Sequence, residues 1–319
     1  MGLPVTVYSS NDVGAPQLSS TTKPLPSEII NILKKCLVEG YGSKAPLGWS
    51  VAFEDSGTFK IAFRNSTVDG SGGYVQYWSD NGLDATNSNL SLKSAMGMSA
   101  LDNFNKAGYR FRHWNSTTNK KWTLIGTSTG FYFIQRFTTH DLNFLNSSQY
   151  EIVYFVGDLD SNYINDSCKF TIAAPNFGGD MTNINYGHSL AILGTTSCNK
   201  IYGVDGNEKE NPHSVDTGTY TSSVTGSNYT LETQGITPIL APVIIRTTSP
   251  SSTDIDNISC SISGKNPWFR GVIPGLVSIG FCGYGDHTWP TIKNWNGHDY
   301  MLLRGYYNGV WLNISEWYS

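Results

Sequence analysis

Short runs of apolar and aromatic residues, separated by turn-forming residues, recur along most of the chain. From residue 49 to residue 156 they follow one another at intervals of about 10–15 residues, the spacing typical of a meandering antiparallel sheet. Glu54-Asp55-Ser56-Gly57 separates the first two runs and predicts a hairpin turn. The predicted strands are Trp49–Phe53, Phe59–Arg64, Tyr74–Trp78, Tyr109–Trp114, Lys121–Ile125, Phe131–Phe137 and Tyr150–Val156.

One helix is predicted near the N-terminus. Apolar residues recur there at spacings of three and four, which places them on one face of a helix. Ser27 is suited to cap this helix, and Gly40 to end it in a left-handed conformation. The apolar positions are Ile29, Ile30, Leu33, Cys36 and Leu37. We expect a helix over residues 27–39 that covers one face of a sheet.

Three segments have less regular patterns. Leu90–Phe104 fits a strand and a helix equally well. Residues 203–233 and 247–257 are rich in small and polar residues and poor in large apolar ones. Both are interpreted as long loops that leave a sheet and return to it, because strand-like runs resume beyond each.

The two ends of the chain differ in character. Residues 1–26 carry few large apolar groups, which predicts an extended arm, either loose or laid against another subunit. Tyr300–Tyr307 and Val310–Ile314 flank Asn308-Gly309, a strong two-residue hairpin signal. We therefore expect an α+β, β-dominant fold in which residues 27–319 form one body. Its antiparallel sheets are sandwich- or barrel-like, with the N-terminal helix packed on a sheet.

Composition narrows the function classes. Only 14% of the 319 residues are charged and 13% are aromatic, which suits pleated sheets better than long helices. The net charge is −4, and Lys34-Lys35 and Lys120-Lys121 are the only basic doublets. Because nucleic-acid binding draws on clustered cations, we expect no nucleic-acid partner. Exposed aromatic residues that stack on sugars stay open as an alternative role.

Cysteine use and hydropathy indicate where the chain folds. The most apolar stretch, Ile236–Ile245, is too short to span a bilayer and contains Pro238 and Pro242. Neither membrane insertion nor a classical signal peptide is expected. The cysteines are odd in number and lack zinc-site spacing, which favours buried free thiols in a reducing cytoplasm. They are Cys36, Cys168, Cys198, Cys260 and Cys282.

Gly126-Thr-Ser128-Thr-Gly130 matches the nucleophile elbow of hydrolases. That motif requires a sharp turn from a strand into a helix, which exposes the serine. The following Phe131-Tyr-Phe-Ile predicts another strand. We therefore interpret the motif as a hairpin turn.

Asp158-Leu-Asp160-Ser-Asn162 begins like a calcium-binding loop. An EF-hand needs glycine at its sixth position and a carboxylate at its twelfth, where this chain has Tyr163 and Lys169. A polar loop is the favoured interpretation, and an improvised cation site that includes Asp166 is a weak alternative.

His287 and His298 lie beside Asp286 and Asp299, residue types that ligate metals or transfer protons. Neighbouring strand residues point to opposite faces, so turn residues are the preferred interpretation.

No catalytic, cofactor-binding or metal-binding residues are assigned, and we expect a protein that is not an enzyme. Carboxylate pairs of glycosidases converge only in space, so a polysaccharide depolymerase stays open.

Several segments together resemble a group of virion-associated proteins encoded by tailed bacteriophages and prophages. Near the ends of the chain they are Gly14-Ala-Pro-Gln-Leu-Ser, Cys36-Leu-Val-Glu-Gly-Tyr-Gly, Ala45-Pro-Leu-Gly-Trp49, Gly297-His-Asp-Tyr-Met-Leu-Leu-Arg and Gly309-Val-Trp-Leu-Asn-Ile. In the centre they are Trp122-Thr-Leu-Ile-Gly, Gly130-Phe-Tyr-Phe and Phe155-Val-Gly-Asp158. The resemblance covers most of the chain and is weakest over residues 203–257.

The resemblance implies a structural component of the virion at the collar, neck whisker or upper tail. Its partners would be other copies of itself and the neck, portal-adaptor or tail proteins. It would fold in the bacterial host cytoplasm before assembly, and it implies no catalytic residue and no cofactor. A tail module that binds a host surface glycan or receptor is the alternative.

Overall fold

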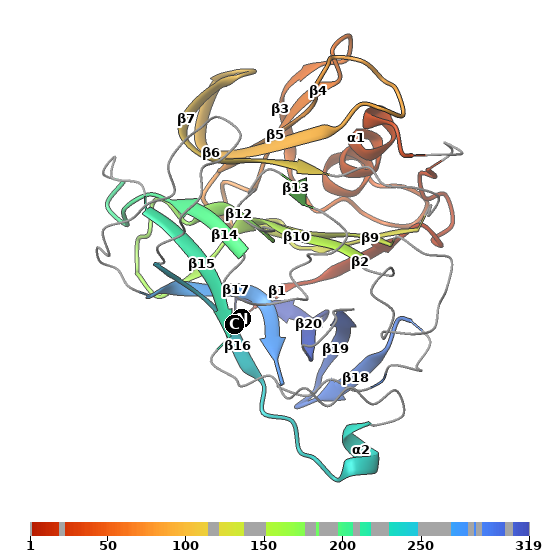
Figure 1. The fold of residues 1–319 in the computed structure, drawn as a ribbon, viewed down its shortest axis with the longest axis vertical. Coiled ribbons are helices and arrows are strands. Elements are labelled where there is room, and N and C mark those ends of the chain that lie inside the picture. Colours follow the sequence, from red (N-terminus) through yellow and green to blue (C-terminus); the bar gives the residue numbers. More distant parts are fainter. Residues whose placement is uncertain are drawn as a thin grey trace.

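The computed structural model describes most of the chain. The described residues are 2–18, 23–113, 121–136, 151–175, 183–184, 197–206, 211–217, 230–247, 269–279, 284, 289–303 and 309–318. Over these residues the expected α+β, β-dominant fold with antiparallel sheets and an N-terminal helix is confirmed. Two sheets face each other in a sandwich-like arrangement, and a third group of strands lies below them (Figure 1).

A six-stranded sheet forms the upper layer in Figure 1. Its order is β13-β7-β6-β5-β4-β3, with antiparallel pairs except between β13 and β7. The ambiguous segment 90–104 is a strand that turns back and begins the next strand. The predicted hairpin between the first two strands is confirmed, but its turn is residues 56–59, because Glu54 and Asp55 belong to the first strand. The strands are β3 (Ser50–Asp55), β4 (Lys60–Arg64), β5 (Tyr74–Ser79), β6 (Leu90–Ala100), β7 (Asn103–His113) and β13 (Asn183–Ile184).

A 13-stranded sheet forms the middle and lower layers. Its middle part contains β2 (Thr6–Ser9), β8 (Trp122–Gly126), β9 (Gly130–Arg136), β10 (Glu151–Asp158) and β12 (Phe170–Pro175). Through β14 (Ser197–Ile201) and β15 (Asn211–Thr217) it continues to β16 (Ala241–Thr247) and β17 (Phe269–Ser278). Beyond these lie β20 (Val310–Asn313), β19 (His298–Leu303) and β18 (Ile292–Trp295), and β11 (Asp160–Ser161) pairs with β17.

The middle strands are buried on both faces. Alternate residues of β9 and β10 pack upward into the core below the six-stranded sheet and downward into the core above β16 and β17. Phe131 and Phe133 belong to the upper core, while Tyr132 and Ile134 belong to the lower one. Burial on both faces explains why these strands read as continuous apolar runs and not as an apolar–polar alternation.

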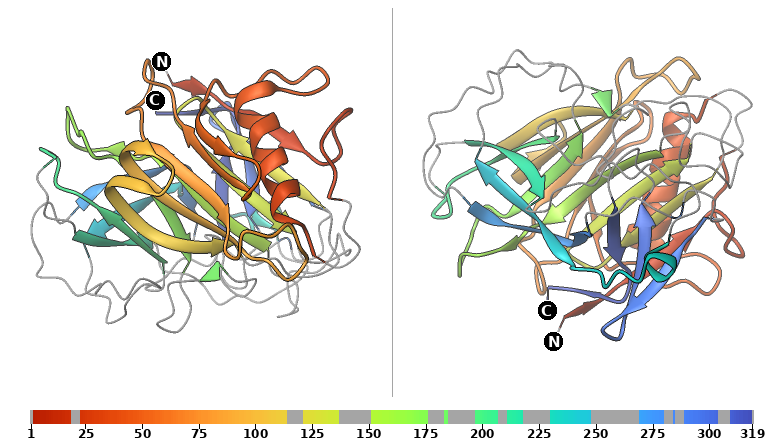
Figure 2. Two further views of the ribbon diagram at one scale, coloured as in Figure 1. Left: turned by 90° about the horizontal axis from the view of Figure 1, so that it is seen from above. Right: turned by 60° about the horizontal axis from the view of Figure 1, so that its bottom comes forward.

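The N-terminal helix packs on the upper core, as Figure 2 shows from above. Helix α1 (Pro26–Lys34) continues as a π-helix, η1 (Lys35–Glu39), and Gly40 ends it with a φ of 78°. Its buried residues include Ile29, Ile32, Leu33, Cys36 and Leu37.

The predicted cap at Ser27 is wrong. Leu25 occupies the N-cap position, and its backbone N–H donates to the Glu28 carboxylate at 2.9 Å. The Ser27 hydroxyl donates instead to Asp84 at 2.6 Å. The helix therefore begins one residue earlier than expected, with Pro26 in its first turn, where a missing N–H costs nothing.

Part of the predicted arm, residues 1–26, belongs to the sheets of its own chain. β2 pairs with β8, and β1 (Leu3–Pro4) pairs with β21 (Glu316–Trp317). Tyr8 is fully buried, and its hydroxyl donates to the Ala45 carbonyl at 2.6 Å. The backbone is extended, as expected, and over these strands it pairs with other strands of the same chain.

The remaining expectations are partly met. β19 and β20 pair as a C-terminal hairpin, but the predicted two-residue turn is wrong, because Leu303 lies opposite Val310 and residues 304–309 connect them; Asn308 lies outside the described residues. Residues 203–233 are not a single loop, because they include β15 and the start of a short helix, α2 (Leu231–Gln234). In the second predicted loop, residues 248–257 lie outside the described residues.

Cys36 and Cys168 are buried free thiols, as predicted. The Cys198 side chain, Cys260 and Cys282 lie outside what the structure describes. No helix among the described residues has the length and apolar character needed to cross a bilayer.

Replacing Tyr8 with alanine tests whether the N-terminal strand belongs to the folded body. Removing a fully buried aromatic side chain is expected to lower the free energy of unfolding by about 3–5 kcal/mol, measured by urea denaturation. Val13→Ala is the control, because Val13 is 91% exposed and its change is expected to stay within about 0.5 kcal/mol. Equal stability of Tyr8→Ala and wild type would contradict this role of the strand.

Candidate functional site

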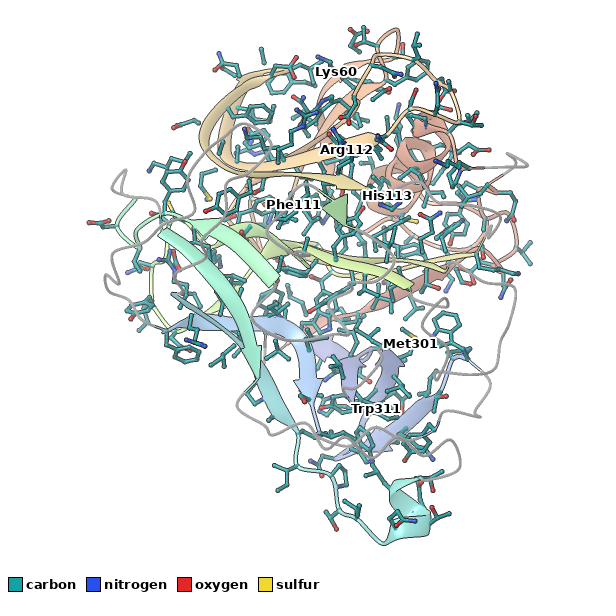
Figure 3. The ribbon with its side chains drawn as sticks, viewed as in Figure 1. Lys60, Phe111, Arg112, His113, Met301 and Trp311 are labelled. Atoms are coloured by element: carbon teal, nitrogen blue, oxygen red, sulfur yellow. The ribbon has the colours of Figure 1, made fainter. Side chains whose placement is uncertain are left out.

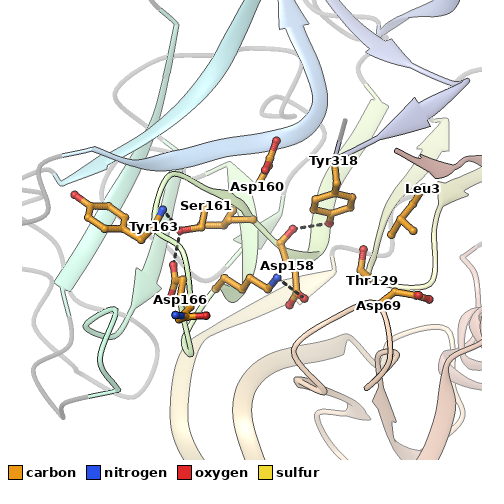
Figure 4. A pocket seen from close by; sticks show the side chains of 12 residues that line it. Leu3, Asp69, Thr129, Asp158, Asp160, Ser161, Tyr163, Asp166 and Tyr318 are labelled. Carbon is orange, nitrogen blue, oxygen red and sulfur yellow. Dashed lines mark hydrogen bonds and ion pairs between the residues drawn. The ribbon is translucent and has the colours of Figure 1, made fainter. Parts of the chain in front are cut away.

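A polar cleft of about 530 Å³ lies where β10 ends and the chain turns into β11. Figure 4 shows it between the loop after β10, the β8–β9 turn and the C-terminal Tyr318. Its lining contains four aspartates and one lysine, from segments far apart in the sequence. The lining residues are Leu3, Asp69, Thr129, Asp158, Leu159, Asp160, Ser161, Tyr163, Asn165, Asp166, Lys169 and Tyr318.

Asp158 is one of two deeply buried aspartates of the cleft, since its side chain, like that of Asp166, is 1% exposed. It accepts hydrogen bonds from the Ser71 backbone N–H at 2.7 Å and from the Ser71 hydroxyl at 2.5 Å. The Lys169 ammonium lies 3.8 Å away. Burial raises the pKa of Asp158 above its ordinary value, although Ser71 and Lys169 oppose the rise. The group is therefore easier to protonate than an exposed aspartate.

Close backbone packing places Asp158 at this point. Gly157 has a φ of 151°, and a Cβ on it would lie 2.3 Å from the Gly130 Cα. Only glycine allows the ends of β9 and β10 to approach this closely. The Asp158 backbone N–H then donates to the Thr129 carbonyl at 3.1 Å, and the Tyr318 hydroxyl donates to the Asp158 carbonyl at 2.6 Å.

Asp160 and Lys169 face the same cleft. Burial raises the pKa of Asp160 above its ordinary value, while the positive charge of Lys169 opposes the rise. Two carboxyl groups with raised pKa values beside an ammonium group can donate and accept hydrogen bonds to a polar ligand. They can also hold a proton more readily than free aspartates.

Asp166 is occupied by a cation of the protein itself. Arg270 donates to both carboxylate oxygens, from Nε at 2.7 Å and from a terminal nitrogen at 2.5 Å, and both side chains are 1% exposed. The Ser161 hydroxyl and the Cys168 backbone N–H also donate to Asp166. The predicted polar loop at residues 158–162 is only partly met, because the segment includes the end of β10 and the short strand β11. A guanidinium takes the place that an improvised cation site with Asp166 would need.

Within the described ranges, no group of three or more histidine, cysteine, aspartate or glutamate residues is arranged to hold a metal ion. Four aspartates line the cleft, but Asp166 is held by Arg270 and Asp158 by Ser71.

The Ser128 motif is a turn between two strands, as predicted. β9 begins at Gly130, so the helix that a nucleophile elbow requires does not follow. The Ser128 hydroxyl donates to Asp69 at 2.7 Å. Trp49 Nε1 and Asn65 Nδ2 donate to the carbonyls of the two threonines beside Ser128, which fastens the turn to the upper layer.

The interpretation of His298 and Asp299 as turn residues is wrong, because they begin β19; they do not line the cleft. Asp299 accepts from Asn294 Nδ2 at 2.8 Å, and His298 Nε2 lies 3.9 Å from Glu316. The paired residues His287 and Asp286 lie outside the described residues.

A second buried polar group lies between the upper and middle layers. His113 is fully buried, and its Nε2 lies 2.6 Å from Gln135 Oε1. Its ring packs edge-on against Phe133 and Tyr154. Burial lowers the pKa of His113 to about 4, and the Gln135 hydrogen bond only partly opposes the shift. The imidazole is therefore neutral at physiological pH.

The residues that complete the cleft could not be found from motifs. Ser71, Arg270 and Tyr318 come from distant segments and share no diagnostic spacing with Asp158. The one local signal was the Gly157-Asp158 pair at the end of an aromatic-rich run, which marks the close approach of β10 to the β8–β9 turn.

Comparisons with known proteins identify no family for this chain. No protein-family model and no curated protein matches this chain.

The buried ion pair between Asp166 and Arg270 allows a test of how the loop that lines the cleft is held in place. Asp166→Asn and Arg270→Met are each expected to lower the free energy of unfolding by about 3–5 kcal/mol, because each leaves a buried partner without its counter-charge. The double variant is expected to lose much less than the sum of the two, which a double-mutant cycle in urea measures. Additive losses would show that the two groups do not depend on each other.

His113 gives a test by pH. Its pKa is about 4 in the folded chain against 6.5 in the unfolded chain, so folding disfavours its protonated form. Stability should therefore be constant above about pH 6.5, fall as the pH drops toward 4 and level off below. The loss from this group is about 3 kcal/mol.

His113→Gln keeps a donor toward Gln135 but cannot titrate, so we expect a flatter profile of unfolding free energy between pH 7 and 4. Val13→Ala is the control, because it changes an exposed side chain and leaves His113 in place, so its profile should run parallel to that of wild type. Identical profiles for His113→Gln and wild type would contradict the assigned pKa.

Proposed function

We propose that this protein acts by binding and assembly and not by catalysis, as a structural subunit of a tailed phage particle at the neck, collar or upper tail. The observation that carries the assembly part is a pair of exposed aliphatic side chains beside a polar cleft. Val68 is 91% exposed and Ile164 is 92% exposed. Their loops also supply Asp69, Tyr163 and Asn165 to the lining of the cleft.

The two loops are held firmly although their tips are exposed. Asp69 accepts from Ser128, and the Ser66 backbone N–H donates to the Ser128 carbonyl at 3.0 Å. On the other side, Asp166 anchors its loop through Arg270. Exposed apolar side chains on fixed loops lose little conformational entropy on binding and would gain from burial against a partner.

The arrangement of charged side chains in the cleft favours binding of a partner over catalysis. Asp158, Asp166 and Lys169 are engaged mainly with other groups of the chain, by the hydrogen bonds and ion pairs given above. Such a network keeps the two loops in place, as an interface between subunits requires. Partners would be other copies of this chain and neighbouring particle proteins.

The phage part of the proposal is supported by the resemblance of the sequence segments quoted above. Three of them, at residues 122–126, 130–133 and 155–158, make up β8, the start of β9 and the end of β10, and Asp158 at the end of β10 lines the cleft. The buried free thiols of Cys36 and Cys168 agree with folding in a reducing host cytoplasm before assembly.

Incorporation into particles tests the proposal. We expect the wild-type chain in purified particles by mass spectrometry, and a ring or set of spikes at the neck by electron microscopy. Val68→Asp and Ile164→Asp are each expected to reduce incorporation at least tenfold, because a charge would be buried at the interface. Val13→Asp adds the same charge at a valine that is equally exposed, 91%, but lies outside these two loops, and it should lower incorporation much less. A monomeric chain that never enters particles would overturn the proposal.

A further inference from the structure

The outer face of the six-stranded sheet carries a concentration of cations and aromatic rings. Residues of β4 to β7 alternate between the core and this face, because strand side chains point to opposite sides in turn. Figure 3 shows Lys60 and Arg112 on the upper side of the sheet, and Phe111 and His113 on the side toward the middle strands.

Strand register arranges the outer residues in rows. Lys60 lies opposite Trp78, Trp78 opposite Ser91, and Ser91 opposite Arg112. In the next row Gln76 lies opposite Lys93, and Lys93 opposite Arg110. Arg64 and Tyr74 form a third, shorter row. Since neighbouring strands are about 4.8 Å apart, the row that begins at Lys60 extends about 15 Å across the four strands, and the other two rows are shorter.

We call this surface the basic face, defined by Lys60, Arg64, Tyr74, Trp78, Asp80, Lys93, Asp102, Arg110 and Arg112. Its five cations and two carboxylates have a net charge of +3, and Asp55, which lies opposite Lys60 at the edge of the face, lowers this to +2. The whole chain carries −4, so the rest of the chain carries −6. The charge of the basic face is thus opposite to that of the remainder, which favours an anionic partner here.

The two carboxylates fix the cations in place. Asp80 accepts from Arg110 at 2.8 Å and from Arg112 at 2.6 Å. Asp102, in the turn between β6 and β7, accepts from Lys60 at 2.6 Å and from Gln76 at 2.7 Å. The tip of the β6–β7 hairpin is thereby bent back over the sheet. Cations held in this way lose less side-chain entropy when they bind a ligand.

Flat guanidinium groups alternate with flat rings on this face. The Arg64 guanidinium carbon lies 5.1 Å from the centre of the Tyr74 ring, and that of Arg110 lies 5.0 Å from the Trp78 ring. A guanidinium binds a carboxylate through two parallel hydrogen bonds, and a partly exposed ring packs against the C–H face of a sugar. The combination fits a sugar polymer that carries carboxylates.

A phosphate polymer fits less well. Nucleic-acid affinity comes mainly from the number of phosphates neutralised, and two carboxylates among five cations reduce that gain. For a polysaccharide, carboxylates such as Asp80 are useful, because they accept hydrogen bonds from hydroxyl groups.

We propose that the basic face binds an acidic polysaccharide, with Arg64, Lys93, Arg110 and Arg112 taking its carboxylates and Trp78 and Tyr74 its sugar rings. This inference goes beyond the assembly role and gives a defined site to the glycan-binding alternative. It requires no place in a particle, so failure of either proposal leaves the other standing.

Binding of the purified full chain to a polyuronate, measured by isothermal titration calorimetry, tests this inference. Neutral dextran and a single-stranded oligodeoxynucleotide are the comparison ligands. We expect binding to the polyuronate at low salt, weakening as ionic strength rises, at least tenfold weaker binding to the oligonucleotide, and none to dextran. No binding to the polyuronate, or tighter binding to the oligonucleotide, would overturn the inference.

Variants locate the site. Arg64→Gln combined with Lys93→Gln is expected to weaken polyuronate binding at least tenfold, and Tyr74→Ala about threefold or more. Lys35→Gln combined with Lys121→Gln removes the same charge away from the face and should change the affinity less than twofold. Circular-dichroism melting of each variant checks folding. An equal loss in the control pair would show non-specific charge attraction and overturn the site.

Discussion

Burial of β9 and β10 on both faces is the constraint on which the rest of the structure depends. Because Phe131 and Phe133 pack upward while Tyr132 and Ile134 pack downward, neither strand has a face that can meet water. A covering layer is therefore needed on each side. The helix and the six-stranded sheet supply one, and β16, β17, β19 and β20 supply the other. Two separate cores follow from a single pair of strands.

The polar cleft forms at the point where the apolar strands β9 and β10 meet the neighbouring turns. At Gly130 and Gly157 the two strands come so close that no side chain fits between them, and the chain must then turn outward. Beyond that point buried polar groups need partners, since water no longer reaches them. Ser71, Arg270 and Tyr318 provide those partners from three distant segments. The same change from apolar to polar packing produces both the end of the core and the start of a binding surface.

The local pattern of apolar and turn-forming residues predicted the strands well. The predicted run Phe59–Arg64 corresponds to β4 at Lys60–Arg64, and the helix was misplaced by one residue at its start. The cap failed for a tertiary reason, because Asp84 binds the Ser27 hydroxyl that was expected to cap the helix.

Strand partners and the cleft were beyond prediction for a different reason. Nothing local to residues 6–9 indicates that they pair with β8, more than a hundred residues away in the chain. Arg270 likewise resembles any surface cation in the sequence, although it is 1% exposed in the fold. The serine motif was interpreted correctly as a turn, because its own flanking residues already indicate two strands. The predicted polar loop at residues 158–162 instead contains the short strand β11, whose partner β17 lies far away in the sequence.

β1 pairs with β21, so the two ends of the described chain lie side by side, as the marks N and C show in Figure 2. Leu3 lies opposite Trp317, so the two ends of the described chain meet on one small area of the surface. Such a body is a natural candidate for circular permutation, since a short peptide would join the present ends and new ends could open in an exposed turn such as that between β3 and β4. Domains fused to either end would leave from almost the same point.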